Sequence, residues 1–236
     1  MKVLIADITI YEDECLYQEH CGILPTGRQE QIGRYRCKRD KYRGVGAGVL
    51  LEYGLNQYGC TLNETRDNYE LVHLAQGKFG KPYIAEKEQL CFNLTHAKDY
   101  VAAVFAPCDV GIDIEQICQA KLKVAKRFFT DEEYRYLMTF DSEKSLFEVS
   151  EGAAQDITAQ DAAFFRMWTR KESYIKAVGE GMHLPLTDFS VLKDQIRGRD
   201  VYYLRTWEMP EQYAVSVCAK ERIDTDISRI ELKKSI

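Results

Sequence analysis

The stretch from Phe164 to Val178 constrains the fold more than any other part of the chain, because its apolar residues recur at helical spacing. On a helical wheel, one broad arc contains Phe164, Met167, Trp168, Tyr174, Ile175 and Val178. We therefore predict a helix from about Ala162 to Val178 that buries this arc and ends at Gly179. A helix of this kind requires an apolar surface to pack on, which the rest of the chain must supply.

Several short apolar runs predict the strands that would form this surface. LCFNL and YVAAVFA read as neighbouring strands joined by a polar connection at residues 95–99, and MKVLIADITI reads as a first strand. Nearer the carboxyl end, strands are predicted in DFSVL, VYYLRTW and YAVSVCA. Strands interleaved with helices predict an α/β (α+β) fold.

The run VGIDIE, after a break at Pro107, alternates strictly between two strand faces. Its aliphatic residues point to the core, and the opposite face carries Gly111, Asp113 and Glu115. Carboxylates at i and i+2 on a strand lie about 6–7 Å apart, close enough to share a hard cation that also binds phosphate oxygens. Solvated carboxylates on an exposed strand face would explain the same pattern.

The predicted helix also carries charged residues that require an explanation. Glu172 and Lys176 lie one turn apart beside the apolar arc. They either point together into the edge of a cleft or form a surface ion pair that stabilises the helix by only ~0.3–0.5 kcal/mol. Lys171 falls inside the arc itself. An unpaired ammonium in the core would cost several kcal/mol, so Lys171 must find a partner or reach solvent.

A basic cluster precedes the first long apolar helix pattern. Between Arg28 and Arg43, seven basic residues face two acidic ones. We predict one helix that starts in this cluster and continues through GVGAGVLLEYGL. Its glycines at 44, 46 and 48 follow a charged helical segment and not a strand, so close helix packing is favoured over a dinucleotide loop.

The tetrad T-D-E-E predicts a helix start with Thr130 as N-cap and Glu133 at the third helical position, running through EYRYLM. Beyond it, the acidic stretch of about residues 141–161 is weakly patterned and is predicted to be a solvated loop or a loose helical excursion. The stretch QICQAKLKVAKR, which follows VGIDIE, is basic and without acids. It reads as a partner surface or as a solvated amphipathic helix.

Composition limits the function classes. The net charge of −5 disfavours nucleic acid as the main partner, and no uncharged apolar run approaches the ~18 residues of a membrane span. Asp7 interrupts the first apolar run too early for a signal peptide. Eight cysteines without a C-x-x-C pair are expected to be reduced thiols, so we expect a cytoplasmic protein.

His96 stands beside Thr95 where a strand is predicted to end. A histidine there is commonly a hydrogen-bonded structural residue. Taken with the carboxylate pair, the basic cluster and several lysines, it describes a site for a polyphosphate ester without a serine or cysteine nucleophile of its own.

Five segments in order, GKPYI, FNLTHA, GIDIE, RFFTDEEY and WTRKESYIKAVGEGM, resemble the 4′-phosphopantetheinyl transferases of the surfactin-synthetase-activating type. The resemblance covers most of the chain. It implies two similar α/β halves, residues 1–106 and 107–236, that form an intramolecular pseudo-dimer with coenzyme A in the cleft between them. The second half would carry the metal-binding carboxylates. A monomer would then hold a full site.

The resemblance also implies roles for individual residues. Asp113, Glu115 and Glu172 look like ligands of Mg²⁺, which Mn²⁺ could replace, and Lys176 would contact the phosphates beside the catalytic Asp113 and Glu172. The residues expected to bind coenzyme A are Arg28 at the 3′-phosphate and, at the nucleotide end, Lys81, Thr95 and His96. Glu133 lies at an acidic position of the family, although its capping role explains it equally well.

The implied reaction is transfer of phosphopantetheine from coenzyme A to a serine of an apo acyl or peptidyl carrier protein, with release of 3′,5′-ADP. Such enzymes activate fatty-acid, polyketide or non-ribosomal peptide synthases. Glu172 or a metal-held water would take the serine proton, and the sequence leaves both open. Three positions depart from the family pattern: Thr95 replaces serine, and Gln31 and Gly44 replace residues near the phosphate, which predicts weaker coenzyme A binding.

Two other classes of function remain as alternatives. A non-catalytic carrier-binding module is disfavoured because Asp113, Glu115, Glu172 and Lys176 are all present. A magnesium-dependent nucleotide hydrolase would be compatible with the carboxylates, but the five ordered segments disfavour it.

Overall fold

The computed structural model describes residues 1–64, 66, 68–140 and 157–233. The described residues form both helices and strands, as predicted, so the α/β fold class is confirmed. The chain divides into two compact units, Met1–Asp109 with Asp224–Ile236, and Val110–Ile223. The carboxyl-terminal segment thus packs with the first unit. The predicted domains 1–106 and 107–236, and their pairing as a pseudo-dimer, stay predictions.

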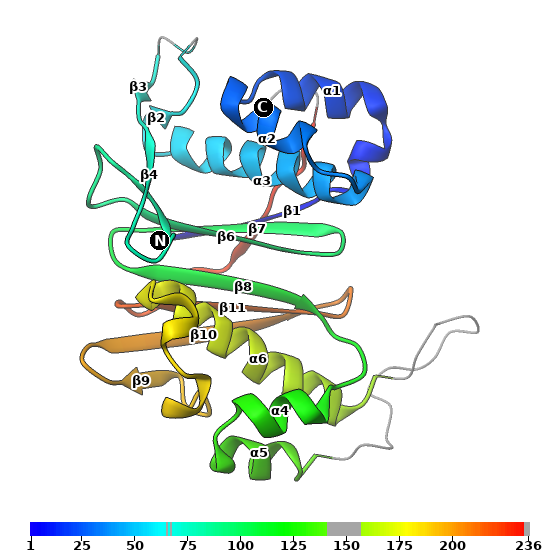
Figure 1. The fold of residues 1–236 in the computed structure, drawn as a ribbon, viewed down its shortest axis with the longest axis vertical. Helices are drawn as coiled ribbons and strands as arrows, with labels where there is room; N and C mark the ends of the chain where they lie inside the picture. Colours follow the sequence, from blue (N-terminus) through cyan, green and yellow to red (C-terminus); the bar gives the residue numbers. More distant parts are fainter. Residues whose placement is uncertain (65, 67, 141–156, 234–236) are drawn as a thin grey trace. The chain divides into compact units, whose positions relative to one another are not determined.

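The first unit is built on a sheet with the strand order β12-β1-β7-β6 (Figure 1). Its strands are β1 Lys2–Asp7, β6 Cys91–Ala97, β7 Tyr100–Ala106 and β12 Ile227–Arg229. β12 runs parallel to β1, and the other pairs are antiparallel. The three strands predicted in this part of the sequence are confirmed. The predicted connection at residues 95–99 is too long, because β6 continues to Ala97 and Lys98 makes the turn with φ 48°.

Helices cover one face of this sheet in Figure 1. They are α1 Glu14–Gly22, α2 Thr26–Gly33 and α3 Lys38–Asn56, preceded by the short helix η1 Thr9–Glu12. The helix predicted to start in the basic cluster and to continue through GVGAGVLLEYGL is α3; it starts at Lys38, and Arg28 lies on the separate helix α2. Helix α2 ends at Gly33, and Ile32 and Tyr35 pack against α3 at Gly44. A Cβ at Gly44 would lie 2.9 Å from Ile32 Cγ1.

The α3 glycines serve close packing, as predicted. A Cβ at Gly46 would lie 2.6 Å from Ile8 Cγ2, and one at Gly48 would lie 2.9 Å from Leu24 Cδ1. Two short pairs complete the unit: β2 Cys60–Thr61 with β3 Glu70–Leu71, and β4 Leu74–Gln76 with β5 Pro82–Ile84.

The second unit is an antiparallel sheet with the order β8-β11-β10-β9, crossed by the long helix α6 (Figure 1). The strands are β8 Val110–Gln116, β9 Gln195–Arg197, β10 Val201–Met209 and β11 Tyr213–Ala219. The predictions for VGIDIE, VYYLRTW and YAVSVCA are confirmed. DFSVL forms no strand, because its backbone groups bond to side chains and not to a neighbouring strand. Phe189 O accepts a hydrogen bond from Lys171, and Val191 N donates one to Glu133.

The helices of this unit begin and end at recognisable signals. They are α4 Leu122–Phe128, α5 Asp131–Leu137 and α6 Ala159–Val178, with short helices η2 Gly181–His183 and η3 Leu186–Asp188. The Thr130–Glu133 capping box is confirmed. α6 starts earlier than predicted, at a second capping box of Thr158 and Asp161, and ends as predicted at Gly179, with φ 79°. Residues 141–156 of the predicted acidic loop lie outside the described residues.

No helix in the described ranges is both long enough and apolar enough to cross a membrane. Each of the eight cysteines lies within those ranges and is a free thiol, as expected.

Gly111 allows α6 to pack directly on β8. A Cβ at this position would lie 2.2 Å from Ser173 O and 2.4 Å from Ala177 N, both backbone atoms of α6. Backbone atoms of a helix cannot move aside as a flexible side chain can, so the distance between β8 and α6 requires glycine here.

We predict that Gly111→Ala lowers the free energy of unfolding by about 3 kcal/mol, since overpacking typically costs 1–3 kcal/mol and the atoms it would strike are backbone. Urea unfolding followed by far-UV circular dichroism measures the change. Gly198→Ala is the matched control, because its Cβ would meet only Tyr174 Oη at 3.7 Å. Equal stabilities of the two variants would contradict this account of Gly111.

Candidate active site

The contact between β8 and α6 brings charged groups together in the second unit. Lys176 Nζ donates to Asp113 Oδ1 at 2.5 Å and to Ile112 O at 3.2 Å. Asp113 is buried, so this charge-assisted bond lies in a low-dielectric setting. Lys176 therefore reaches across from the helix to the strand, which favours the cleft-edge interpretation over a solvated helix surface.

The carboxylates of this site repel one another. Burial, with a further contribution from the charge of Asp113, raises the pKa of Glu115 to about 7, and Lys176 partly offsets the rise. Burial and the same aspartate also raise the pKa of Glu172. Asp113, Glu115 and Glu172 are thus close enough to interact, and their clustered negative charge is what a cation would relieve.

The donor chemistry of this cluster suits magnesium, since Mg²⁺ prefers oxygen ligands and accepts a few carboxylates beside substrate phosphates. In the part of the chain that the structure describes, however, no three His, Cys, Asp or Glu side chains are gathered as a metal cage. The residues present fit magnesium in ligand type, and Lys176 holds one oxygen of Asp113.

The residues predicted to bind the 3′-phosphate and the nucleotide of coenzyme A belong to the first unit, whereas Lys176, predicted to contact the other phosphates, belongs to the second. Arg28 is half-buried on α2, and its guanidinium donates to Gln31 Oε1 at 2.9 Å and to Gly44 O at 3.2 Å. Gln31 and Gly44 are two of the positions that the sequence analysis identified as departures from the family pattern. Both therefore hold Arg28 in a fixed orientation.

Lys81 lies immediately before β5, and Thr95 and His96 lie on β6. As neighbours on one strand, Thr95 and His96 point to opposite faces, with Thr95 buried and His96 exposed. His96 is within the strand and not beyond its end, contrary to the prediction.

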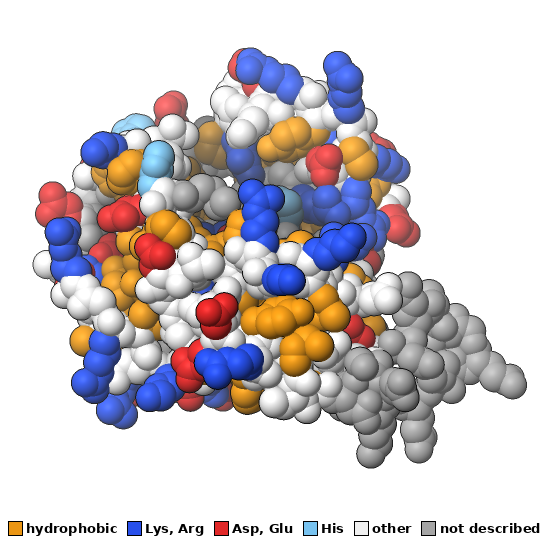
Figure 2. All heavy atoms as spheres, turned by 60° about the horizontal axis from the view of Figure 1, so that its bottom comes forward, with side chains coloured by type: hydrophobic (Ala, Val, Ile, Leu, Met, Phe, Trp, Pro, Cys, Tyr) orange, Lys and Arg blue, Asp and Glu red, His pale blue; other side chains and the backbone are white. Residues whose placement is uncertain are grey.

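Part of the basic cluster is neutralised by ion pairs. Arg43 pairs with Asp40 at 2.8 Å, and Arg39 lies 3.5 Å from Glu12 and also pairs with Asp99. On the face shown in Figure 2, basic side chains likewise lie beside acidic ones at several places. Acids from other segments, Glu12 and Asp99, thus offset part of the excess of basic residues in this stretch.

The sequence did not reveal the partner of Lys171. The structure pairs it with Glu133 at 2.8 Å, and neither side chain is exposed to solvent. Burial lowers the pKa of Lys171, and the Glu133 carboxylate offsets this effect. The only signal in the sequence was the place of Lys171 within the apolar arc. Glu133 thus acts both in the capping box and in this ion pair.

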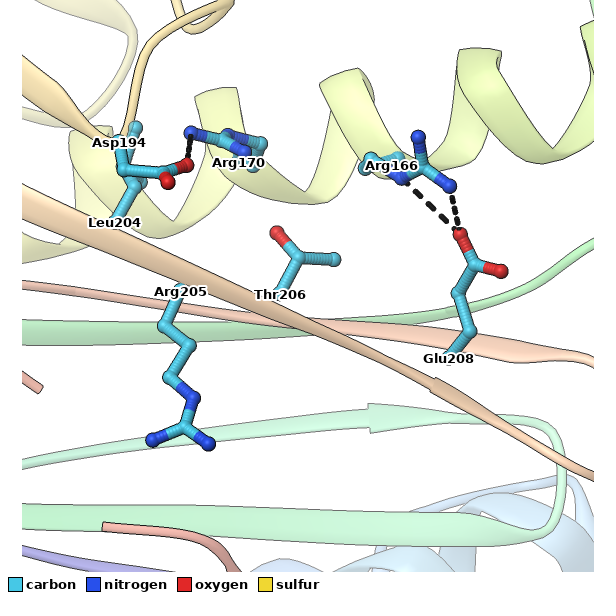
Figure 3. Close-up of a pocket in the computed structure, with 7 residues that line it drawn as sticks. All are labelled: Arg166, Arg170, Asp194, Leu204, Arg205, Thr206 and Glu208. Carbon is cyan, nitrogen blue, oxygen red and sulfur yellow. Dashed lines mark hydrogen bonds and ion pairs between the residues drawn. The ribbon is translucent and has the colours of Figure 1, made fainter. Parts of the chain in front are cut away.

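A hollow of about 400 Å³ between α6 and β10 was also not predicted (Figure 3). Arg166 from α6 pairs with Glu208 from β10, and Arg170 pairs with Asp194 at 2.7 Å. Arg166 and Arg170 thus each face an acidic partner, which offsets two of the three positive charges in the lining, the third being that of Arg205.

The basic stretch after β8 leads into α4 and runs along nearly all of that helix, with its charged residues facing solvent. Its exposed residues are Lys121, Lys123, Lys126 and Arg127. Lys121 lies near enough to Glu115 to lower the pKa of that carboxyl, against the larger effects that raise it. This surface therefore adjoins the carboxylate cluster.

Comparison with known proteins points to one family. Residues 109–218, which contain β8 and α6, match the 4′-phosphopantetheinyl transferase superfamily. The chain is 30% identical over 215 residues to the 4′-phosphopantetheinyl transferase gsp of Aneurinibacillus migulanus, covering 87% of this chain and 80% of that protein. It is 30% identical over 223 residues to the 4′-phosphopantetheinyl transferase Sfp of Bacillus subtilis, covering 89% and 90%.

A eukaryotic relative shows lower similarity. The L-aminoadipate-semialdehyde dehydrogenase-phosphopantetheinyl transferase of Saccharomyces cerevisiae is 26% identical over 196 residues, covering 78% of this chain and 64% of that protein. The match to the bacterial enzymes extends across both units and includes the segment in which Asp113, Glu172 and Lys176 meet. The chain therefore belongs to the 4′-phosphopantetheinyl transferase superfamily, as its sequence motifs indicated, and is a transferase of that kind.

Proposed function

We propose that this enzyme transfers phosphopantetheine from coenzyme A to a serine of an apo acyl or peptidyl carrier protein, releases 3′,5′-ADP, and so activates fatty-acid, polyketide or non-ribosomal peptide synthases. The observation that carries the proposal is the coupled cluster of Asp113, Glu115, Glu172 and Lys176 where β8 meets α6. Free thiols at every cysteine suit the reducing cytoplasm in which it would act, as a monomer.

Asp113, Glu115 and Glu172 would hold Mg²⁺, or Mn²⁺ in its place. When bound, the metal would neutralise charge on the pyrophosphate oxygens. Lys176, positioned by Asp113 and Ile112 O, would bind a phosphate oxygen and stabilise the charge that develops on the leaving group. Glu172 or an ordered water would accept the proton of the attacking serine.

Arg28 would bind the 3′-phosphate of coenzyme A, with Lys81, Thr95 and His96 at the nucleotide. A guanidinium already oriented by Gln31 and Gly44 O loses little freedom when it pairs with a phosphate. The departures at Gln31 and Gly44 thus fit a site in which Arg28 is the main phosphate contact.

We predict that Asp113→Ala and Glu172→Ala each abolish transfer while leaving the fold intact, and that chelation does the same to the unaltered enzyme. The assay incubates the protein with coenzyme A, Mg²⁺ and a panel of apo carriers, and reads the gain of one phosphopantetheine by intact mass. Near-normal kcat for either variant in excess Mg²⁺ would rule out the three-carboxylate site. Release of phosphopantetheine without a carrier would indicate a hydrolase instead.

We predict that Arg28→Ala weakens binding of coenzyme A by about tenfold or more, the loss of one charge-assisted phosphate contact of ~1.5–3 kcal/mol, and leaves dephospho-coenzyme A almost unaffected. Isothermal titration of both ligands measures the difference. Arg34→Ala is the control, because Arg34 is exposed and pairs only loosely with Glu30, at 3.9 Å. An equal loss for both ligands would remove Arg28 from this role.

The carrier is expected to dock on the basic surface of Lys121 and Lys123. We predict that reversing both to glutamate raises the KM for carrier on the order of tenfold at low salt and flattens its salt dependence, since exposed charges chiefly steer encounter. The KM for coenzyme A should stay nearly unchanged. Lys193→Glu with Arg197→Glu is the control, because it makes the same charge change at exposed sites of the same unit. Unaltered carrier kinetics in the Lys121 and Lys123 variant would exclude this surface.

A further inference from the structure

We propose that the buried Lys171–Glu133 pair is a positioning device that sets the rotation of α6 about its axis, and thereby aims Glu172 and Lys176 at the β8 carboxylates. This inference rests on the proposed function of those residues and adds two residues that act through them.

The ammonium of Lys171 is fully engaged. Its three protons can be assigned to Glu133 Oε2 at 2.8 Å, Leu186 O at 2.6 Å and Phe189 O at 2.8 Å. The ring of Phe189 also lies 4.4 Å from Nζ, within range of a cation–π interaction. A tetrahedral group bonded in three directions has one orientation, so the Lys171 side chain is fixed relative to η3 and the segment after it.

The Glu133 carboxylate is fixed just as firmly. Its Oε2 accepts from Thr130 N at 2.7 Å in the capping box, and its Oε1 accepts from Val191 N at 2.7 Å. The pair therefore joins the start of α5, the segment from Leu186 to Val191, and α6. Because both side chains are wholly buried, water does not compete for these bonds.

Stability alone does not account for an ion pair at this place. Desolvating two charges costs several kcal/mol per ion, and apolar residues of similar volume are often as stabilising as a buried pair or more so. An apolar contact, however, leaves a helix free to slide and turn by small amounts. The bonds of Lys171 have direction, which apolar packing lacks.

Direction matters because of the position of Lys171 in the helix. Glu172 follows it, about 100° further around the axis at 3.6 residues per turn. Gly111 fixes how close α6 lies to β8, through the backbone of Ser173 and Ala177, but does not by itself fix the rotation. Lys171 adds a buried, directed constraint on that rotation, which favours the meeting of Lys176 with Asp113.

Three variants separate an effect on the position of Glu172 and Lys176 from an effect on the stability of the protein. Lys171→Met with Glu133→Gln removes the charges at similar volume, and Glu133→Asp keeps the charge but shortens the side chain by one methylene. Arg166→Met with Glu208→Gln is the matched control, an ion pair between the same helix and the sheet that is partly exposed. For each variant we would measure Tm, kcat, both KM values and the Kd of Mn²⁺ by electron paramagnetic resonance, well below the Tm.

In both Lys171–Glu133 variants we expect kcat to fall by about 10- to 100-fold, because small misplacements of reacting groups cause losses of this size. Mn²⁺ binding should weaken by about tenfold, and neither KM should change much. The control should keep wild-type values. Wild-type kcat and Mn²⁺ affinity in either folded variant, or an equal loss in the control, would overturn the inference. If the double variant fails to fold, Glu133→Asp decides alone. A wild-type protein that neither transfers phosphopantetheine nor binds Mn²⁺ would instead refute the proposed function.

Discussion

The second unit depends on a backbone contact between a strand and a helix, which glycine alone permits. At Gly111 the helix α6 comes so close to β8 that a single methyl group would strike its backbone. This closeness lets Lys176 reach Asp113 and places Glu172 within the electrostatic influence of the strand carboxylates. Without it, the apolar arc of α6 could still pack on the sheet, but the charged residues on the two elements would not meet.

The site that results is electrostatically costly. Burial and mutual repulsion raise the pKa values of Glu115 and Glu172, and Lys176 compensates only in part. Clusters of like charge that a fold holds together against repulsion are characteristic of functional sites, because a cation or a charged substrate relieves them. The Lys171–Glu133 pair beside this cluster is the opposite case: a buried charge pair whose hydrogen bonds are directed and satisfied within the protein. On α6, Lys171 thus belongs to an internally satisfied pair, and the neighbouring Glu172 belongs to the carboxylate cluster.

The first unit shows how distant parts of the chain complete one sheet. β12 adds to β1 as a parallel strand, Leu232 is buried, and the ring of His20 bonds through Nε2 to Lys233 O at 3.1 Å. His20 in turn bonds through Nδ1 to the Tyr11 hydroxyl at 3.0 Å. Residues after Asp224 therefore contribute to the core of the unit that contains the amino terminus, while Val110–Ile223 form their own core.

The sequence by itself determined much of this protein. Strict alternation identified β8, periodicity identified α6, the T-D-E-E tetrad located the start of α5, and the five ordered motifs indicated the family. These are local signals, set by backbone geometry and side-chain spacing within a few residues. Sequence did not reveal the break between α2 and α3, since it depends on Ile32 packing at Gly44, nor the irregular path of residues 188–192, whose backbone groups bond to Lys171 and Glu133. It marked Lys171 as anomalous but could not name its partner. Only the tertiary structure decided these points, because the groups involved are far apart in the chain and meet only when the elements pack.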